Sequence, residues 1–231
     1  MTGPVTTPHR ATAARPSVTD QVFDALQRQV LTLELPPGTR ISEVEVAKAL
    51  DVSRQPVRDA FYRLSKLGYL LIRPQRATTV SLISQAAVMQ ARFIRTALEV
   101  ETVAVAATAL GEDDLDALAE ILDRQKQAVD AEERPAFHQL DDLFHYEICT
   151  RAGLGFVWEL VAENKGHMDR VRMLSLSFAS ERAYDDHLQI FAALKTRDPA
   201  RAVQTMRDHL SRITLMIDRI RDENLDWFAD D

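Results

Sequence analysis

The chain has 231 residues, a length that allows one large domain or two ordinary ones. Apolar residues make up 46% and charged residues 27%, a globular composition that excludes general disorder. A single cysteine, Cys149, excludes a disulfide framework and a four-cysteine zinc site. No apolar run approaches the ~20 residues of a membrane span, and no signal-peptide stretch stands at the N-terminus, so we expect a soluble cytoplasmic protein without membrane contact.

The net charge of −7 is unevenly distributed. Residues 1–83 hold 11 Lys and Arg against 7 Asp and Glu, which gives +4, and residues 84–231 hold 17 against 28, which gives −11. A basic first third on an acidic remainder indicates that the first third is the part that meets a polyanion.

Residues 1–16 show no periodic pattern and are expected to form a flexible tail. A first helix is expected to begin at a cap from Ser17 or Thr19 and to end before Pro36–Gly38. Its buried face is marked by four apolar residues at spacings of 4, 4 and 3: Val22, Leu26, Val30 and Leu33.

Two more helices and a hairpin follow. A short helix is expected over residues 43–50, and a third helix from a Ser53 cap to about Leu67. Residues 69–82 contain two extended runs around a turn at Pro74–Ala77, which predicts a hairpin. Three short helices and a hairpin are typical of a winged helix-turn-helix domain.

The predicted winged helix-turn-helix domain, residues 17–83, would present its third helix to the DNA major groove. Arg54 and Arg58 lie at i and i+4 on one face of that helix, and Gln55 stands beside them. Arginine suits a bidentate contact with guanine, which favours DNA binding. A basic helix face exposed to water is the alternative that these residue types leave open.

Residues 35–80 read LPPGTRISEVEVAKALDVSRQPVRDAFYRLSKLGYLLIRPQRATTV. The Pro-Gly turn, the Ser-Glu start of the second helix and the VSRQPVRDAFYRL segment resemble the DNA-binding domain of the GntR family of bacterial transcription regulators. The resemblance implies that Arg54, Gln55 and Arg58 contact a double-stranded DNA operator.

Two positions depart from that family pattern. Val44 stands where some members carry a DNA-contacting arginine, and Ala77 stands where the tip of the wing is usually glycine. A glycine there would permit positive φ and a close approach of the backbone to the minor groove. We therefore expect the recognition helix to contact DNA, whereas contact by the wing stays open.

Residues 84–225 are expected to form a second, all-α domain, because no strand pattern survives after Ser84. Six or seven helices are expected in it. Turn or cap residues mark the breaks between them, near Gly111, Arg134-Pro135, Gly153–Gly155, Ser175–Ser180 and Asp198-Pro199.

Three of these predicted helices carry apolar stripes that include polar residues. The first stripe contains Phe137, Leu140, Asp141, Phe144, His145 and Ile148. The second contains Tyr184, His187, Leu188, Phe191 and Leu194. The third contains Ala202, Met206, His209, Leu210, Ile213 and Ile217. Three histidines and one aspartate are therefore expected to point inward from three helices.

Buried polar groups need partners, and one metal ion would serve all four side chains. Asp141 and His145 can chelate one ion from a single helix face, and His187 and His209 would complete the set. Three imidazoles and a carboxylate suit a divalent ion, with Zn²⁺ as the first expectation and Ni²⁺ or Mn²⁺ as alternatives. The competing interpretation is that each polar group hydrogen-bonds locally within an apolar face.

Residues 84–225 also resemble the FCD effector domain, which marks the FadR subfamily of GntR regulators. The matching pieces are RTALE at 95–99, LDDLFH at 140–145, DHLQIFAAL at 186–194 and MRDHL at 206–210. The resemblance implies an antiparallel helical bundle that dimerises, and a metal ion held by Asp141, His145, His187 and His209.

The same resemblance implies that Arg95 grips the carboxylate of a small effector, for which an arginine fork is well suited. An i, i+4 ion pair with Glu99 is the other interpretation of Arg95. Asn164 and His167 fall on a stripe with apolar residues and are expected to face the same pocket. Basic and amide groups beside a metal favour a sugar acid or a hydroxy acid as the effector.

We therefore expect an effector-responsive transcription regulator, in this family most often a repressor, that binds an inverted-repeat operator as a homodimer. A metal-dependent hydrolase is the alternative, since an ion with open positions can activate water. A metal-stabilised interaction protein without a small ligand is a third possibility. No additional base or nucleophile stands out in the sequence, which argues against the hydrolase.

Overall fold

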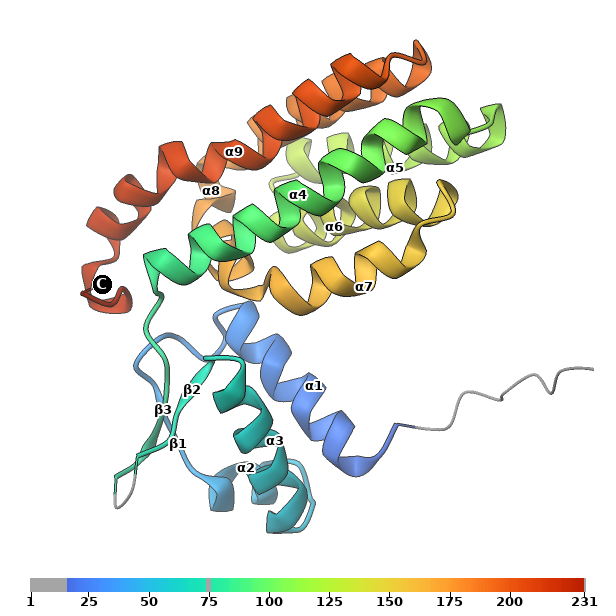
Figure 1. Ribbon diagram of the computed structural model, residues 1–231. Coiled ribbons are helices and arrows are strands. Elements are labelled where there is room, and N and C mark those ends of the chain that lie inside the picture. The colour runs from blue at the N-terminus through green and yellow to red at the C-terminus, as the bar shows by residue number, and fades with distance from the viewer. Residues whose placement is uncertain (1–15, 74–75, 231) are drawn as a thin grey trace, which may run out of the picture.

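The computed structural model describes residues 16–73 and 76–230 (Figure 1). A small domain with three helices and a sheet is followed by a larger domain of helices, and one connection from β3 to α4 joins them. The expected fold class, a winged helix-turn-helix followed by a helical bundle, is confirmed. The predicted tail lies outside the described residues, apart from its last residue, Pro16.

The N-terminal domain contains α1 (Val18–Leu31), α2 (Glu43–Ala49) and α3 (Arg54–Lys66). Ser17 caps α1 in a capping box: its hydroxyl accepts from the Asp20 N–H, and the Asp20 carboxylate accepts from the Ser17 N–H. The apolar faces of α1 and α3 meet in one core, to which they contribute Val22, Phe23, Leu26, Val30, Val57, Ala60, Phe61 and Leu64.

The sheet of this domain has three short strands in the order β1-β3-β2. β2 (Leu70–Leu71) and β3 (Thr78–Val80) pair antiparallel, as a hairpin requires, and β1 (Arg40–Ile41) pairs with β3 on its other side. The sequence did not predict β1, because two residues are too few to show an alternating pattern. In the predicted turn, Pro74 and Gln75 lie outside the described residues.

The second domain contains six long or medium helices in its described part. They are α4 (Gln85–Ala109), α5 (Glu112–Asp130), α6 (Arg134–Arg151), α7 (Gly155–Asn164), α8 (Gly166–Lys195) and α9 (Pro199–Glu223). In Figure 1, α4 and α9 lie side by side, and the start of α4 meets the end of α9, so the two helices are antiparallel.

One predicted break in this domain is wrong. The segment Ser175–Ser180 lies inside α8, where the Ser175 hydroxyl donates to the Arg172 carbonyl and the Ser180 hydroxyl to the Leu176 carbonyl. Serine is tolerated there because its hydroxyl bonds back to the helix. The true break comes earlier, between α7 and α8, where Gly166 packs so closely on Tyr69 that an added Cβ would lie 2.0 Å from the tyrosine oxygen.

The end of the chain returns to the junction between the domains. The Ile83 N–H donates to the Trp227 carbonyl over 2.8 Å, and the Ala229 N–H donates to the Ile83 carbonyl over 2.9 Å. A 3₁₀ helix, η1 (Leu225–Trp227), brings Phe228 into a buried position against Ile83. The packed helical domain therefore extends beyond the expected limit at residue 225.

The length and hydropathy of the helices show whether any of them could span a membrane. Across residues 16–73 and 76–230, no helix combines the length and the apolar character that a membrane span requires.

Candidate metal centre, effector pocket and DNA-reading helix

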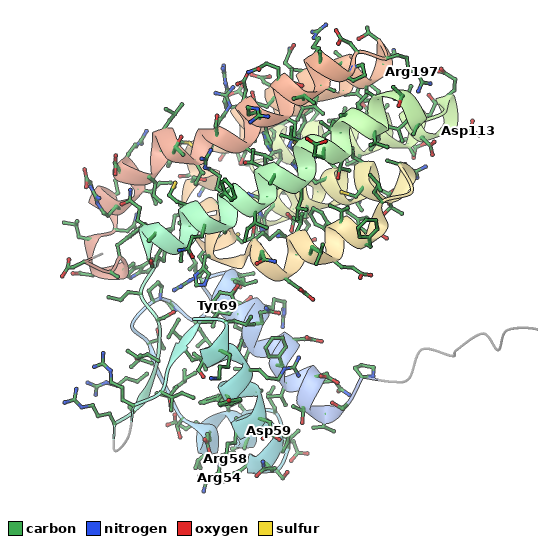
Figure 2. All side chains as sticks on the ribbon, in the orientation of Figure 1. Arg54, Arg58, Asp59, Tyr69, Asp113 and Arg197 are labelled. Carbon is green, nitrogen blue, oxygen red and sulfur yellow. The ribbon has the colours of Figure 1, made fainter. Side chains whose placement is uncertain are left out.

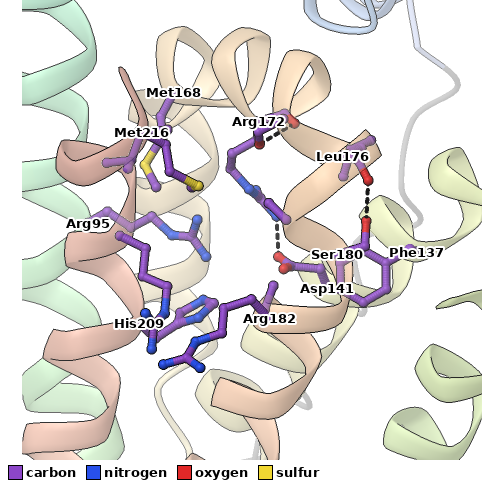
Figure 3. A pocket seen from close by; sticks show the side chains of 15 residues that line it. Arg95, Phe137, Asp141, Met168, Arg172, Leu176, Ser180, Arg182, His209 and Met216 are labelled. Carbon is purple, nitrogen blue, oxygen red and sulfur yellow. Dashed lines mark hydrogen bonds and ion pairs between the residues drawn. The ribbon is translucent and has the colours of Figure 1, made fainter. Parts of the chain in front are cut away.

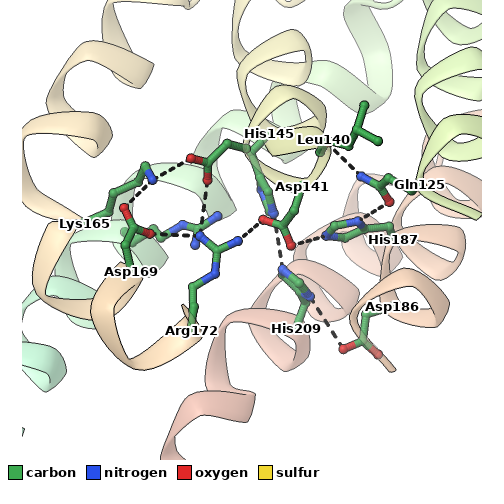
Figure 4. Close-up of polar contacts among 12 residues, drawn as sticks. Gln125, Leu140, Asp141, His145, Lys165, Asp169, Arg172, Asp186, His187 and His209 are labelled. Carbon is green, nitrogen blue, oxygen red and sulfur yellow. Dashed lines mark hydrogen bonds and ion pairs between the residues drawn. The ribbon is translucent and has the colours of Figure 1, made fainter. Parts of the chain in front are cut away.

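The four predicted metal ligands meet in the middle of the helical domain (Figure 4). Asp141 and His145 come from α6, His187 from α8 and His209 from α9, and one ligand atom from each lies within 4.8 Å of the others. His145 Nε2 lies 3.2 Å from His209 Nε2, and His187 Nε2 lies 3.6 Å from Asp141 Oδ1. The sequence-based prediction that these side chains converge therefore agrees with the structure.

Each histidine of this cluster turns its other ring nitrogen, Nδ1, to a polar partner. His145 Nδ1 lies 2.5 Å from Glu99 Oε2, and His209 Nδ1 lies 3.6 Å from Asp186 Oδ2. His187 Nδ1 lies 2.8 Å from the Gln125 side-chain oxygen. The Gln125 hydrogen bond orients the His187 ring, acidic side chains lie beside Nδ1 of the other two rings, and the Nε2 atoms are left for the centre of the cluster.

Gln125, on α5, is one residue of the site that the sequence analysis missed. Its side chain is fully buried, and its amide nitrogen donates to the Leu140 carbonyl over 2.9 Å, so its oxygen is aimed at His187. A signal was present in the sequence, because Gln125 continues an apolar stripe on α5 with Leu118, Ile121, Leu122 and Ala128.

Asp141 divides its two oxygens between the histidines and an arginine. Arg172, on α8, binds Oδ2 of Asp141, while Oδ1 faces His187. Burial alone would raise the pKa of Asp141, but Arg172 and the three histidines hold that pKa well below 3.8. The carboxylate is therefore ionised and available as a ligand at neutral pH.

Burial keeps two of the histidines neutral. It lowers the pKa of His187 well below 6.5, and the neighbouring His209 lowers it further. Burial also lowers the pKa of His209, although the nearby Asp186 carboxylate opposes this shift. Neutral imidazole is the form that coordinates metals, so the site favours ligation over protonation.

A pocket of about 70 Å³ opens beside the cluster (Figure 3). Asp141 and His209 form part of its wall, and Arg95 on α4 lines it on the side of His209. Arg95 is also paired with Glu99 through Nε, so the i, i+4 pair predicted as an alternative is present. Its Nη2 is buried without a hydrogen-bond partner among the described residues, which leaves a donor directed to the pocket.

The expected pocket positions of Asn164 and His167 are wrong. Asn164 is exposed, and its amide donates to the Leu160 carbonyl over 2.8 Å. His167 lies at the junction with the DNA-binding domain, with Nε2 3.0 Å from the Leu67 carbonyl. The sequence-based prediction assumed one continuous helix through residues 164–167. In the structure α7 ends at Asn164 and α8 begins at Gly166, so the two residues do not share a helix face.

Two further arginines of α8 have polar partners: Arg170 is buried, and the side chain of Arg172 is 13% exposed. Arg172 binds Asp141, Asp142 and Asp169 and lines the pocket. Arg170 is fully buried, and its Nη2 donates to the Ser81 carbonyl over 2.6 Å. Burial lowers the pKa of Arg170 to about 10.

The three predicted DNA-contacting residues lie on the first two turns of α3. Figure 2 shows Arg54 and Arg58 at the end of the N-terminal domain farthest from the helical domain. Their side chains are 60% and 58% exposed, and both approach Glu43 of α2, at 3.5 and 3.4 Å. Gln55 donates to Asp59 over 2.9 Å. Glu43 thus holds two exposed guanidinium groups at a helix N-terminus, where phosphate is also favoured.

Comparison with known families assigns both domains. Residues 18–80 match the gntR family of bacterial regulatory proteins, and residues 90–212 match the FCD domain. The two matches agree with the resemblances seen in the sequence.

Individual relatives agree with these matches over most of the chain. The HTH-type transcriptional repressor RspR of Escherichia coli is 37% identical over 93% of this chain and 95% of its own length. The E. coli McbR/YncC structure has a TM-score of 0.75 at 24% identity, and covers 89% of this chain and 99% of that one. A putative GntR regulator from Rhodococcus has a TM-score of 0.70 at 22% identity, and covers 86% and 96%. These relatives are transcription regulators, so the hydrolase alternative finds no support.

Proposed function

This chain belongs to the gntR family of bacterial regulatory proteins, which are DNA-binding transcription regulators, and we propose that it represses transcription until a small carboxylate binds its helical domain. The observation that carries the proposal is that Asp141 and His209, two members of the four-residue cluster, also line the pocket. Repression is proposed from the name of RspR, and the homodimer from the two-fold operators that helix-turn-helix dimers bind.

The cluster fits a divalent metal ion on the chemistry of its donors. Ligands of one zinc ion, each about 2.0–2.1 Å from it, lie roughly 3.3 Å apart. Two of the ligand pairs in the cluster are 3.2 and 3.6 Å apart, and all four ligand atoms lie within 4.8 Å of one another. His187 Nε2 is buried with no hydrogen-bond partner among the described residues, a costly arrangement that a bound ion would relieve. The ion, when bound, would polarise a carboxylate or hydroxyl oxygen of the effector.

The pocket favours a small acid over a large ligand. Its volume of about 70 Å³ is well below the roughly 300–1,000 Å³ of sites for drug-sized molecules. Arg95 Nη2 supplies an unpaired donor, and arginine binds carboxylates through directed hydrogen bonds. A hydroxy acid or a small sugar acid would use its hydroxyl and carboxylate oxygens at the cluster and at Arg95.

α8 connects this pocket with the DNA-binding domain. Arg172 binds Asp141 at the cluster, and Arg170, two residues earlier, donates to the carbonyl of Ser81, directly after β3. His167, one turn farther back, contacts the carbonyl of Leu67, which ends α3. An effector that alters the contact between Asp141 and Arg172 therefore acts on the same helix that holds the winged domain.

The proposal is tested with full-length protein loaded with Zn²⁺, Ni²⁺ or Mn²⁺ and a duplex operator selected from random DNA. We expect the selected sites to be inverted repeats, and an L-lactate or D-gluconate titration to release the operator. Arg170→Gln should keep both acid binding and operator binding but reduce the release. Arg124→Gln, an exposed arginine of α5 outside the pocket, is the matched control.

A selected site without two-fold symmetry would contradict the dimeric repressor. Operator binding that ignores every tested acid on metal-loaded protein would contradict the effector role, even if the DNA assignment stands. If Arg170→Gln responds like Arg124→Gln, the connection through α8 is wrong.

A further inference from the structure

We infer that the pocket selects acids with two negative groups, and that Arg182 of α8 binds the second group. The inference rests on the proposed effector function and deepens it. It is carried by the positions of two arginines that keep unpaired donors and by the charge balance of the site.

Arg95 provides the first position. Its side chain is only 2% exposed, Nε is used by Glu99, and Nη2 has no partner among the described residues. Arg172 and Arg212, which also line the pocket, are in contrast held by Asp141 and Asp186. Arg95 is therefore the one of these three buried or half-buried arginines that keeps an unsatisfied donor for a ligand.

Arg182 provides the second position. It lines the same pocket, is exposed, and has no ion pair or hydrogen bond with any described residue. Figure 3 shows the guanidinium groups of Arg95 and Arg182 on either side of the His209 ring. A ligand bound beside His209 would thus meet one guanidinium at each side, and its second carboxylate would reach Arg182 at the open side of the pocket.

The net charge of the ion-paired side chains around the cluster, together with that of Arg182, also favours an effector with two carboxylates. Without metal, the ion-paired side chains of this network carry one net negative charge: Glu99, Asp141, Asp142, Asp169 and Asp186 against Arg95, Lys165, Arg172 and Arg212. The histidines are neutral when they coordinate. A divalent ion would change this net charge from −1 to +1, which one carboxylate offsets. The exposed guanidinium of Arg182, which has no ion-pair partner among the described residues, remains for a second carboxylate.

L-Malate and L-lactate make a matched pair of probes, because both carry the same hydroxyl next to a carboxylate and only malate has a second carboxylate. Calorimetric titration of the metal-loaded full chain measures both affinities. Bound metal is quantified before and after each titration to detect stripping of the ion. We expect malate to bind more tightly than lactate. Arg182→Gln should weaken malate about 3- to 10-fold and leave lactate unchanged, while Arg124→Gln should change neither.

Each outcome separates this inference from the proposed function. Equal affinities for malate and lactate would overturn the second carboxylate but leave a monocarboxylate effector in place. An Arg182→Gln variant that keeps the full preference for malate would overturn the role of Arg182. Failure of both acids to bind protein that holds its metal would overturn the carboxylate effector itself, and this inference with it.

Discussion

The recognition helix α3 carries exposed charged side chains, whereas those of the metal cluster are buried. Arg54 and Arg58 are more than half exposed and share one carboxylate, Glu43, at distances of at least 3.4 Å. At the cluster, Asp141 and Glu99 are almost fully buried and each touches two partners. The exposed arginines keep their donors for a partner that arrives from outside, whereas the buried groups are oriented before anything binds.

This difference separates how the two sites are expected to respond to substitution. Surface ion pairs contribute little to stability, so the arginines of α3 can change without harm to the fold. Buried charges depend on every partner, so loss of one contact leaves another group unsatisfied. Substitutions on α3 should therefore lower only the affinity for DNA. Substitutions in the cluster should lower both the affinity for the metal and the stability of the fold.

The largest effect is expected at the cluster. His187→Gln and His209→Gln should each lower the affinity for the metal by more than the roughly 10–100-fold that loss of an outer partner costs, because each removes a ligand. Metal content after purification without chelator is the measurement, and His167→Gln, at the junction with the DNA-binding domain, is the control. Variants that remain folded by circular dichroism and still hold one ion per chain would contradict the assignment.

The next effect is expected on α3. Arg54→Ala and Arg58→Ala should each cost about 1–3 kcal/mol of operator binding if the side chains contact bases. Fluorescence anisotropy over a salt series checks this, with Lys66→Ala at the far end of the same helix as the control. The melting temperature should stay unchanged, which is the contrast with the cluster. Full-strength binding by both variants would show that α3 does not read the operator through these arginines.

A comparable but more selective effect is expected at Gln125. Gln125→Ala removes the partner of His187 Nδ1 while it leaves all four ligands, so the metal should bind about 10–100-fold more weakly. Competition with a fluorescent chelator measures the change. Gln127→Ala, exposed on the same helix, should behave as the unaltered protein does. Equal metal affinity in the two variants would mean that Gln125 only fills space.

The smallest effect is the dependence of stability on pH in metal-free protein. The pKa values of His187 and His209 are lowered from 6.5 in the fold, so below about pH 6.5 the unfolded chain takes up protons that the folded chain does not. The free energy of unfolding should therefore decrease as the pH is lowered below about 6.5, by up to about 1.4 kcal/mol per pH unit for each histidine. Denaturant unfolding between pH 8 and 5.5 measures it, and a flat profile would contradict the buried neutral state.

The same contrast explains what the sequence could predict. The family motif lies in one continuous stretch around α3, and the four ligands fall on helices with clear apolar periods, so local patterns located both sites. Gln125 and Glu99 also lie on such helices, but a single polar residue in an apolar stripe does not reveal its partner on another helix. Asn164 and His167 were misplaced because the chain breaks at Gly166, where close packing on Tyr69, a contact distant in sequence, decides the geometry.

The central claim is that the buried cluster controls the exposed arginines, and operator affinity under four conditions tests it most directly. The full chain is measured with and without metal, each with and without L-malate, by anisotropy on the selected operator. We expect malate to weaken operator binding in the metal-loaded protein alone. The same operator affinity under all four conditions, or an equal response to malate without metal, would contradict the account.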